Sequence, residues 1–222
     1  DMFCNVIITR PFDQFFTYKI KKDQMLVEGS IVRVPFGKSK YEIGMVESIS
    51  KNMPLNNNYK IKEVEKVFES IVLSKNIIRF IYWISDYTIS PIGLVLKLFL
   101  INEKIIDFSV NKIKDNSFSL DKVKLNKDQK KAVVVIKKLL IKPALPLVLE
   151  GVTGSGKTEV FFEAIENVIK KNQQALIMVP EISLTPQLEN RFLKRFGFLP
   201  NVWHSKISEK KRKEIWHRCY LG

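Results

Sequence analysis

Residues 145–171 read LPLVLEGVTGSGKTEVFFEAIENVIKK, and this stretch decides the fold class. The apolar run at 145–151 predicts a buried strand, and the apolar spacing of residues 157–171 predicts a helix. Between them, GVTGSGKT at 151–158 matches the P-loop pattern G-x-x-x-x-G-K-[ST] in full, in the strand-to-helix context that this motif requires. A second apolar run, QALIMVP at 174–180, predicts another buried strand. The order strand, helix, strand indicates a right-handed βαβ unit and an α/β fold with a parallel sheet.

The glycine-rich turn predicts a site for the phosphates of a nucleoside triphosphate. Its backbone N–H groups and the positive end of the following helix can point at phosphate oxygens. We expect Lys157 to reach the β- and γ-phosphates and the Thr158 hydroxyl to ligate Mg²⁺, and these two residues take the catalytic roles. The alternative is a chance match in an ordinary glycine turn. The predicted nucleotide-binding residues of the turn are Gly151, Val152, Thr153, Gly154, Ser155, Gly156, Lys157 and Thr158.

Two further helices are predicted around the P-loop. Residues 126–141 form an amphipathic pattern with Asn126 as a plausible N-cap. Gln129 lies on this helix, and taken alone it is most simply a solvated side chain. Residues 204–218 (HSKISEKKRKEIWHR) form a basic, helix-like segment with Trp216 on one side. A solvated face is the default interpretation of such a segment, and direct contact with DNA is the alternative.

The loop after the second predicted strand is a candidate DNA contact. In an open α/β sheet the carboxyl ends of the strands form the ligand crevice, so residues 180–186 are expected on the same rim as the P-loop. Hydroxyl and amide side chains commonly bind DNA phosphates. A plain connection, with Thr185 as N-cap before Pro186, is the other interpretation. The candidate DNA-binding residues here are Ser183, Thr185 and Gln187.

The first hundred residues carry a different pattern. Four β-rich runs separated by turn formers predict a small β-barrel or curled sheet. Residues 53–60 are expected to form a surface loop, and apolar spacing predicts helices around residues 77–85 and over 92–100. Residues 106–124, with weak periodicity and mixed charge, are the predicted linker. The four runs are VIITR at 6–10, FFTYKI at 15–20, SIVRVPF at 30–36 and EIGMVESI at 42–49.

A turn in this first part is a candidate pocket. Phe16 and Tyr18 alternate along one predicted strand and therefore share a face. Phe36, Gly37 and Lys38 occupy the tight turn between two other strands. Aromatic rings beside a glycine turn and a lysine are able to stack a base and hold a phosphate. The ordinary alternative is that the aromatic rings belong to the core.

Composition favours a cytosolic protein with a polyanionic partner. The formal charge is +14, from 37 Lys and Arg against 23 Asp and Glu, and 45% of the residues are hydrophobic. Such a charge favours nucleic acid, although a lysine-rich background composition is the alternative. Cys4 and Cys219 form no CxxC motif, so neither a disulfide framework nor a zinc site is expected in this chain. The apolar run around residues 89–101 is too short to span a membrane, and no signal peptide is recognisable.

Together these residues resemble the primosomal protein N′ (PriA) family of replication-restart helicases. The resemblance covers nearly the whole chain except residues 106–124. In the second part it is carried by LNKDQ at 125–129, GVTGSGKTEV at 151–160, MVPEISLTPQ at 178–187 and the HS…R…W pattern at 204–216. In the first part it is carried by GSIVRVPFGK at 29–38, EIGMVESIS at 42–50, IKEVEKVF at 61–68 and DYTISPIGLVL at 86–96.

The resemblance implies an ATP- and Mg²⁺-dependent 3′→5′ DNA helicase of bacterial replication restart, located in the cytoplasm with the nucleoid. Its implied partners are forked or single-stranded DNA with a 3′ end, single-stranded-DNA-binding protein and other primosome proteins. It also implies that Gln129 contacts adenine. A Thr17 hydroxyl departs from the acidic residue common in the family, which puts end selectivity in question. The implied 3′-end pocket consists of Phe16, Thr17, Tyr18, Gly37, Lys38 and Lys62.

Larger departures from the family shape the expected domain organisation. Residues 106–124 are too few for the family's winged-helix domain, because small independent domains need roughly 40–60 residues. The acidic Asp-Glu segment, the second helicase lobe and the zinc module do not occur in these 222 residues. We therefore expect a piece of a longer protein that binds ATP without hydrolysing it. The predicted organisation is an end-binding domain at 1–105, a linker at 106–124 and a partial RecA-like helicase lobe at 125–222.

Two other functions remain open from the sequence. An unrelated P-loop kinase would need a substrate lid and acidic residues after the second βα unit, where residues 204–218 are basic instead. A pure binding module would capture DNA ends through its first part and carry the P-loop passively. Binding to DNA with a free or a blocked 3′ end tests the end-capture function.

Overall fold

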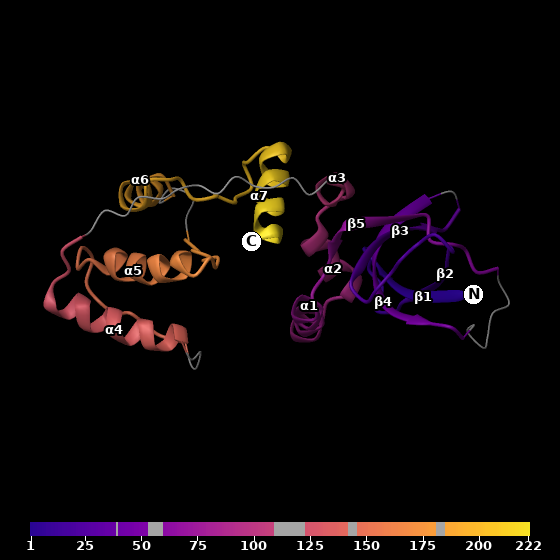
Figure 1. Cartoon of the computed structure of the whole chain (residues 1–222), viewed down its shortest axis with the longest axis horizontal. Coiled ribbons are helices and arrows are strands. Elements are labelled where there is room, and N and C mark those ends of the chain that lie inside the picture. The colour runs from indigo at the N-terminus through magenta and orange to yellow at the C-terminus, as the bar shows by residue number, and fades with distance from the viewer. Residues whose placement is uncertain (39, 53–59, 109–122, 142–145, 181–184) are drawn as a thin grey trace. The chain divides into compact units, whose positions relative to one another are not determined.

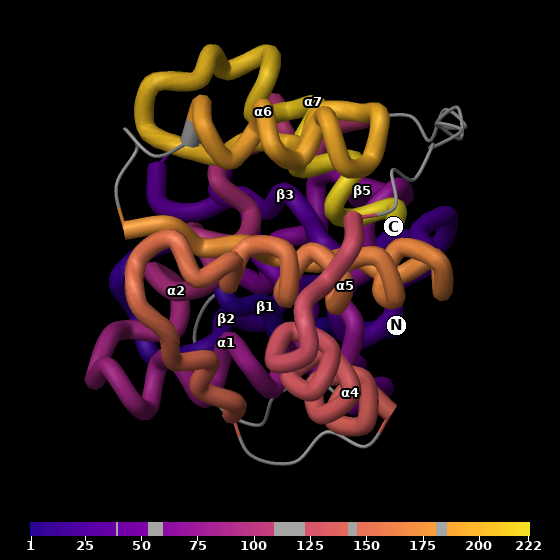
Figure 2. The backbone as a smooth tube through the Cα atoms, turned by 90° about the vertical axis from the view of Figure 1, so that its left-hand side faces the viewer, coloured from indigo at the N-terminus to yellow at the C-terminus, as the bar shows by residue number. Residues whose placement is uncertain are grey.

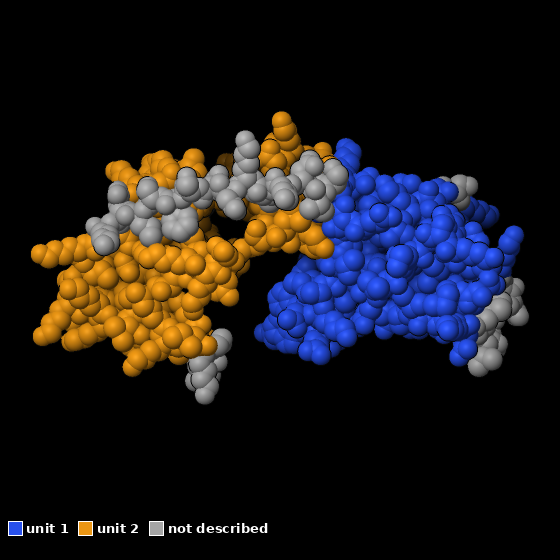
Figure 3. All heavy atoms as spheres, in the orientation of Figure 1, with its two compact units in different colours: residues 1–111 blue, residues 112–222 orange. Residues whose placement is uncertain are grey.

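The chain folds as two compact units, Asp1–Asn111 and Lys112–Gly222, shown in separate colours in Figure 3. The division falls within the predicted linker, although residues 109–122 lie outside the described residues, so the predicted domain limits stay predictions. The predicted surface loop at 53–60 also falls almost wholly outside them. The residues that the computed structural model describes are 1–38, 40–52, 60–108, 123–141, 146–180 and 185–222.

The first unit is built on one antiparallel sheet with the strand order β2-β1-β4-β3-β5 (Figure 1). Four strands confirm the four predicted β-rich runs, with the first displaced toward the amino terminus. The fifth strand is not among the predicted runs, although the alternation in KVFESIV is a usable signal for it. The strands are β1 Met2–Ile8, β2 Phe16–Ile20, β3 Ser30–Phe36, β4 Lys40–Ser50 and β5 Lys66–Val72.

The residues before β5 close this sheet into a small barrel. The outer edge of β2 pairs with residues 62–64, because the Lys19 N–H donates to the Lys62 carbonyl at 2.9 Å and the Lys19 carbonyl accepts from Val64 at 3.0 Å. The next residues along the chain reach the other edge, where β5 pairs with β3. One segment therefore joins both edges, as the predicted barrel or curled sheet requires.

Alternating side chains give the sheet two apolar faces. On the outer face Ile31 and Met45 are fully buried, and the helix α2 (Ile92–Leu100) packs on β1 and β4. The helices α1 (Lys75–Thr88) and α3 (Glu103–Ile106) flank it on the same side of the sheet (Figure 1). The helices predicted around 77–85 and over 92–100 are thus confirmed. The inner face packs Cys4, Val6, Ile8, Tyr18, Ile20, Val32, Val34, Val46 and Val64 into one cluster.

The second unit is described as helices, with α5 lying between α4 and α6 in both Figure 1 and Figure 2. Phe162 and Ile165 of α5 pack against Phe192 and Phe196 of α6 and form its core. The helices predicted over 126–141 and 157–171 are confirmed, and the basic segment 204–218 becomes helical only from Glu209. The bounds are α4 Lys127–Ile141, α5 Lys157–Lys170, α6 Thr185–Phe196 and α7 Glu209–Leu221.

The two buried strands predicted beside the P-loop differ from the structure. Residues 146–150 and 174–179 are neither strands nor buried in the described part of the chain. Val148 is 78% exposed and Met178 is 84% exposed, whereas Ile177 is partly buried against the cluster of α5 and α6, so most of these two apolar runs lies outside a core. An apolar run signals a tendency to be buried, but a strand exists only when a neighbour pairs with it and helices cover both faces of a parallel sheet. The predicted parallel sheet is therefore not shown.

Two features are absent from the part of the chain that the structure describes. None of its helices is long and apolar enough to cross a membrane. No group of three or more His, Cys, Asp or Glu side chains in that part of the chain is placed to hold a metal ion.

Candidate nucleic-acid and nucleotide sites

Aromatic rings gather where β2 meets the end of β3. The ring centroids of Phe16 and Phe36 are 5.0 Å apart, and Phe12 lies 5.5 and 5.7 Å from them. These three rings are partly buried, whereas Tyr18 on the same face of β2 is only 4% exposed and belongs to the core. The Tyr18 hydroxyl donates to the Pro35 carbonyl at 3.1 Å, and burial raises the pKa of this phenol to about 12. Tyr18 therefore stays a neutral donor that fixes β2 to β3.

Two lysines lie at the β3–β4 turn that follows. The Lys62 ammonium group donates to the Gly37 carbonyl at 3.0 Å, which joins the segment before β5 to the turn. Gly37 has a φ of +66°, a left-handed conformation that favours glycine. The side chains of Lys62 and Lys38 are exposed there. The structure thus brings Phe16, Tyr18, Gly37, Lys38 and Lys62 to one end of the barrel.

Thr17 joins this group in a different way from its neighbours in β2. Its side chain lies on the opposite face of the strand, where the hydroxyl donates to the Asn5 side-chain oxygen at 2.9 Å. The Asn5 amide in turn donates to the Ser48 hydroxyl at 3.1 Å, which gives a polar row across β2, β1 and β4. The backbone N–H and C=O groups of Lys19 face residues 62–64 at the outer edge of β2. Because the direction of these groups repeats every second residue along a strand, the N–H and C=O groups of Thr17 face the same edge. Thr17 therefore presents its backbone, not its hydroxyl, toward the Lys62 segment.

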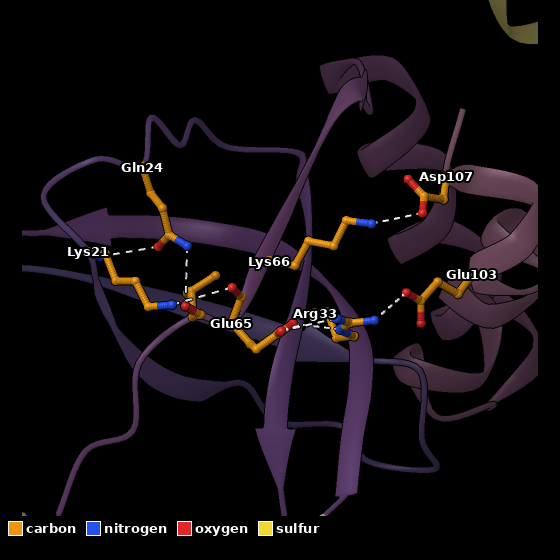
Figure 4. Close-up of polar contacts among 8 residues, drawn as sticks. Lys21, Gln24, Arg33, Glu65, Lys66, Glu103 and Asp107 are labelled. Atoms are coloured by element: carbon orange, nitrogen blue, oxygen red, sulfur yellow. Dashed lines mark hydrogen bonds and ion pairs between the residues drawn. The ribbon is translucent and has the colours of Figure 1, made fainter. Parts of the chain in front are cut away.

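A polar network holds that segment in place (Figure 4). The Arg33 guanidinium binds both carboxylate oxygens of Glu65, at 2.6 and 3.0 Å, and reaches Glu103 of α3 at 2.6 Å. Gln24 donates to the Val64 carbonyl at 3.2 Å from the other side. The hydrogen bond from Arg33 holds the pKa of the Glu65 carboxyl below its usual value. Sequence patterns did not find this network, because its members come from four separate segments of the chain.

The P-loop forms a curled turn at the start of α5. Gly154 and Gly156 have φ angles of +81° and +83°, which only glycine adopts without strain. The Lys157 ammonium group folds back over the turn and donates to the carbonyls of Gly151 and, at 3.0 Å, Val152. Residues 151–155 of the turn are exposed. A curled turn, an ammonium group above it and the first amides of a helix together fit a triphosphate.

Gln129 reaches this turn from α4. Its side-chain oxygen accepts from the Asn126 N–H at 2.8 Å, while the Asn126 side chain accepts from the Gln129 N–H at 2.9 Å. This reciprocal pair is a capping box and confirms the predicted N-cap. The Gln129 amide group also donates to the Gly156 carbonyl at 3.2 Å. A Cβ atom on Gly156 would lie 2.2 Å from that amide nitrogen, so glycine is needed for this close approach.

Thr158 has a partner that the sequence patterns missed. Arg191 of α6 donates to the Thr158 hydroxyl at 3.0 Å and to the Glu159 carboxylate at 2.8 Å. One helical turn later Arg195 binds Glu163 and, at 2.8 Å, Glu166. The four-residue spacing of the arginines in α6 and of acidic residues in α5 was the available signal.

The remaining DNA candidates are only partly placed. Ser183 lies outside the described residues, and α6 begins at Thr185, whose side chain also lies outside the description. Gln187 is exposed in the first turn of α6. In α7 the Trp216 ring stacks on Tyr220 with centroids 5.5 Å apart. The proposed contact of these residues with DNA stays a prediction.

Two family models match the chain, one in each unit. The model described as a 3′ DNA-binding domain, that of PriA, matches residues 5–101. The model described as the res subunit of type III restriction enzymes matches residues 122–220. The fold and the sites thus define a DNA-binding domain of small β-rich type followed by a helicase-type portion.

Curated relatives show which family this is. The replication restart protein PriA of Rickettsia felis is 37% identical over 202 residues, which cover 89% of this chain and 30% of the relative. PriA of Helicobacter pylori is 30% identical over 195 residues, covering 87% and 29%. PriA of Bacillus subtilis is 49% identical over 72 residues, covering 32% and 9%. The chain belongs to the PriA family of replication restart proteins, and it spans about a third of the length of its Rickettsia felis relative.

Proposed function

We propose that the first unit binds the 3′ end of a DNA strand at the pocket formed by Phe16, Gly37, Lys38, Lys62 and the Thr17 backbone. The convergence of these residues at the β3–β4 turn, within a domain that matches a 3′ DNA-binding model, supports this function. The phenylalanine ring stacks the terminal base, and the two ammonium groups attract the backbone phosphates. Neither contact depends on base identity, so the pocket accepts any sequence.

The edge of β2 supplies the selectivity for an unmodified end in this proposal. The Thr17 C=O group accepts a hydrogen bond from a terminal 3′ hydroxyl, whereas a 3′ phosphate has no such donor at neutral pH and is repelled by that oxygen. The test compares single-stranded DNA ending in a 3′ hydroxyl with the same strand ending in a 3′ phosphate. Tighter binding of the hydroxyl end is expected, and equal affinities would contradict the end-capture function.

For the second unit we propose the binding of ATP with Mg²⁺ at the P-loop. Residues 151–157 hold the phosphates, Thr158 provides a ligand for Mg²⁺ and Gln129 lies close enough to the turn to contact the adenine. The bound metal would neutralise phosphate charge, and the chain's own amides and Lys157 orient the phosphates. The match to a helicase-type model favours this function over a small-molecule kinase.

The whole protein, on this proposal, is an ATP-driven 3′→5′ DNA helicase that acts with single-stranded-DNA-binding protein and primosome proteins in the bacterial cytoplasm. The 222 residues taken alone bind ATP but do not hydrolyse it, because they hold no Asp-Glu segment to activate water. Phosphate release by this chain with and without DNA tests the second statement. A DNA-stimulated rate above that of a Lys157→Ala variant would contradict it.

A further inference from the structure

Arg191 is the residue that links the P-loop to α6. Its guanidinium donates through Nη1 to the Thr158 hydroxyl at 3.0 Å and through Nη2 to Glu159 at 2.8 Å. Its side chain is 49% exposed, so the guanidinium lies at the rim of the site and not in the core between the helices. The guanidinium is therefore open to solvent beside the P-loop.

The packing of α6 does not depend on this contact. Arg195, on the same face of α6, is 5% exposed and binds two carboxylates of α5, Glu163 and Glu166. The rings of Phe192 and Phe196 pack on Phe162 between the two helices, with centroids 5.8 and 5.5 Å from its own. These contacts hold the carboxyl-terminal half of α6 whether or not Arg191 stays bound.

The Thr158 hydroxyl oxygen has two competing uses. It accepts from Arg191 in this structure, and it is the atom expected to ligate Mg²⁺ in the proposed nucleotide complex. Mg²⁺ binds oxygen at about 2.0–2.1 Å, so a guanidinium nitrogen near the same oxygen places two positive groups side by side. A nucleotide without Mg²⁺ instead attracts the Arg191 guanidinium, since its phosphates are negatively charged.

We propose that Arg191 is a positioning residue that holds the Thr158 hydroxyl in the nucleotide-free state and gives it up when Mg²⁺ and nucleotide bind. The inference rests on the proposed nucleotide binding. On release, Arg191 keeps Glu159 or turns to the phosphates, and α6 loses its contact with the Thr158 hydroxyl.

The experiment measures the affinity of the 222-residue chain for fluorescent mant-ATP in Mg²⁺ and in EDTA. The informative quantity is the ratio of the dissociation constant in EDTA to that in Mg²⁺. A purely structural role of Arg191 would leave this ratio unchanged. Arg191→Ala is expected to increase the advantage given by Mg²⁺ by about fivefold or more, a typical coupling between two ligands. Arg191→Lys, which keeps the charge but loses the forked donor, is expected to give a smaller increase.

Two controls make the result specific. Lys194→Ala removes an exposed cation of the same helix and is expected to keep the wild-type ratio. In a Thr158→Ala background, Arg191→Ala is expected to change the ratio much less than in the wild-type background, because only the attraction between the guanidinium and the metal-free phosphates remains. An unchanged or lower ratio in Arg191→Ala, or an equally large effect without Thr158, overturns the inference alone. Wild-type chain that binds mant-ATP in neither condition overturns the proposed nucleotide site and this inference with it.

Discussion

The hydroxyl of Thr17 donates to the side-chain oxygen of Asn5 at 2.9 Å, on the face of β2 opposite to Phe16. The Thr17 side chain is therefore occupied within the sheet. What Thr17 turns toward the Lys62 segment is its backbone. A change of the side chain that keeps the strand intact should leave DNA-end binding unaffected.

Thr17→Val tests this relationship, because valine keeps the shape and the β-propensity of threonine but cannot donate. We expect unchanged preference for a 3′ hydroxyl over a 3′ phosphate, together with a loss of about 0.5–1.5 kcal/mol in unfolding free energy from the lost hydrogen bond. Fluorescence anisotropy and urea denaturation measure the two effects. Asn5→Ala should lower stability in the same way. Loss of end preference in Thr17→Val with normal stability would show that the hydroxyl itself binds the DNA end.

Phe16 is expected to carry the stacking of the terminal base. Phe16→Ala should weaken binding of a 3′-hydroxyl strand by about 1–3 kcal/mol, the usual contribution of one base stacked on an aromatic ring. Phe15→Ala is the matched control, since the Phe15 side chain is 52% exposed and precedes the strand. Equal losses in the two variants would argue against a stacking role for Phe16.

Lys62 is expected to contribute charge at the same pocket. Lys62→Ala should reduce the slope of log affinity against log salt by about 1, the signature of one lost phosphate contact. Lys60→Ala, which removes an exposed lysine two residues earlier, should change the slope less. If both variants give the same slope, Lys62 acts only as part of a diffuse positive surface.

The Arg33–Glu65 pair gives the first unit a stability that depends on pH. The guanidinium lowers the pKa of Glu65 in the folded state from its ordinary value of 4.5. A carboxyl with a depressed folded pKa contributes stability above its unfolded pKa and loses it as the pH falls through the folded pKa. Wild-type protein should therefore lose stability below about pH 4.5, and Arg33→Met should lose less over the same range while being less stable at pH 7.

Thermal denaturation between pH 3 and pH 7 measures this dependence. Arg79→Met, which removes an exposed arginine of α1, is the control and should follow the wild-type profile. The Glu65 side chain is partly open to solvent, so the effect is expected to shrink in high salt. A parallel acid profile in Arg33→Met and wild type would assign the acid sensitivity to other carboxyls.

Local patterns in the sequence predicted much of the fold. The β-rich runs between turn formers predicted β2, β3 and β4, and Asn126 as an N-cap predicted the start of α4, which the Asn126–Gln129 hydrogen bonds confirm. The two-residue period put Phe16 and Tyr18 on one face, whereas the resemblance implied a pocket that also includes Thr17, whose side chain lies on the other face. Local signals sufficed where the determining contacts lie within one turn or one strand.

Contacts between distant segments could not be predicted in this way. Arg33 meets Glu65 and Glu103 only after the sheet has closed, and Arg191 meets Thr158 only after α6 packs on α5. The apolar runs beside the P-loop show a second limit of prediction from the sequence. Their composition indicates burial, but a strand needs a pairing partner that composition does not specify.

The ammonium group of Lys157 tests the nucleotide site most directly. In this structure it donates to the carbonyls of Gly151 and Val152, so it is already held above the turn where the phosphates are proposed to bind. Lys157→Ala removes the charge and the two hydrogen bonds but leaves the glycines that shape the turn. We expect mant-ATP affinity to fall by about 10-fold or more, because a hydrogen bond to a charged group contributes about 1.5–3 kcal/mol. Lys171→Ala, at the far end of α5 and exposed, should retain wild-type affinity. Equal affinities of the two variants would place the nucleotide elsewhere and leave the turn as a structural start of α5.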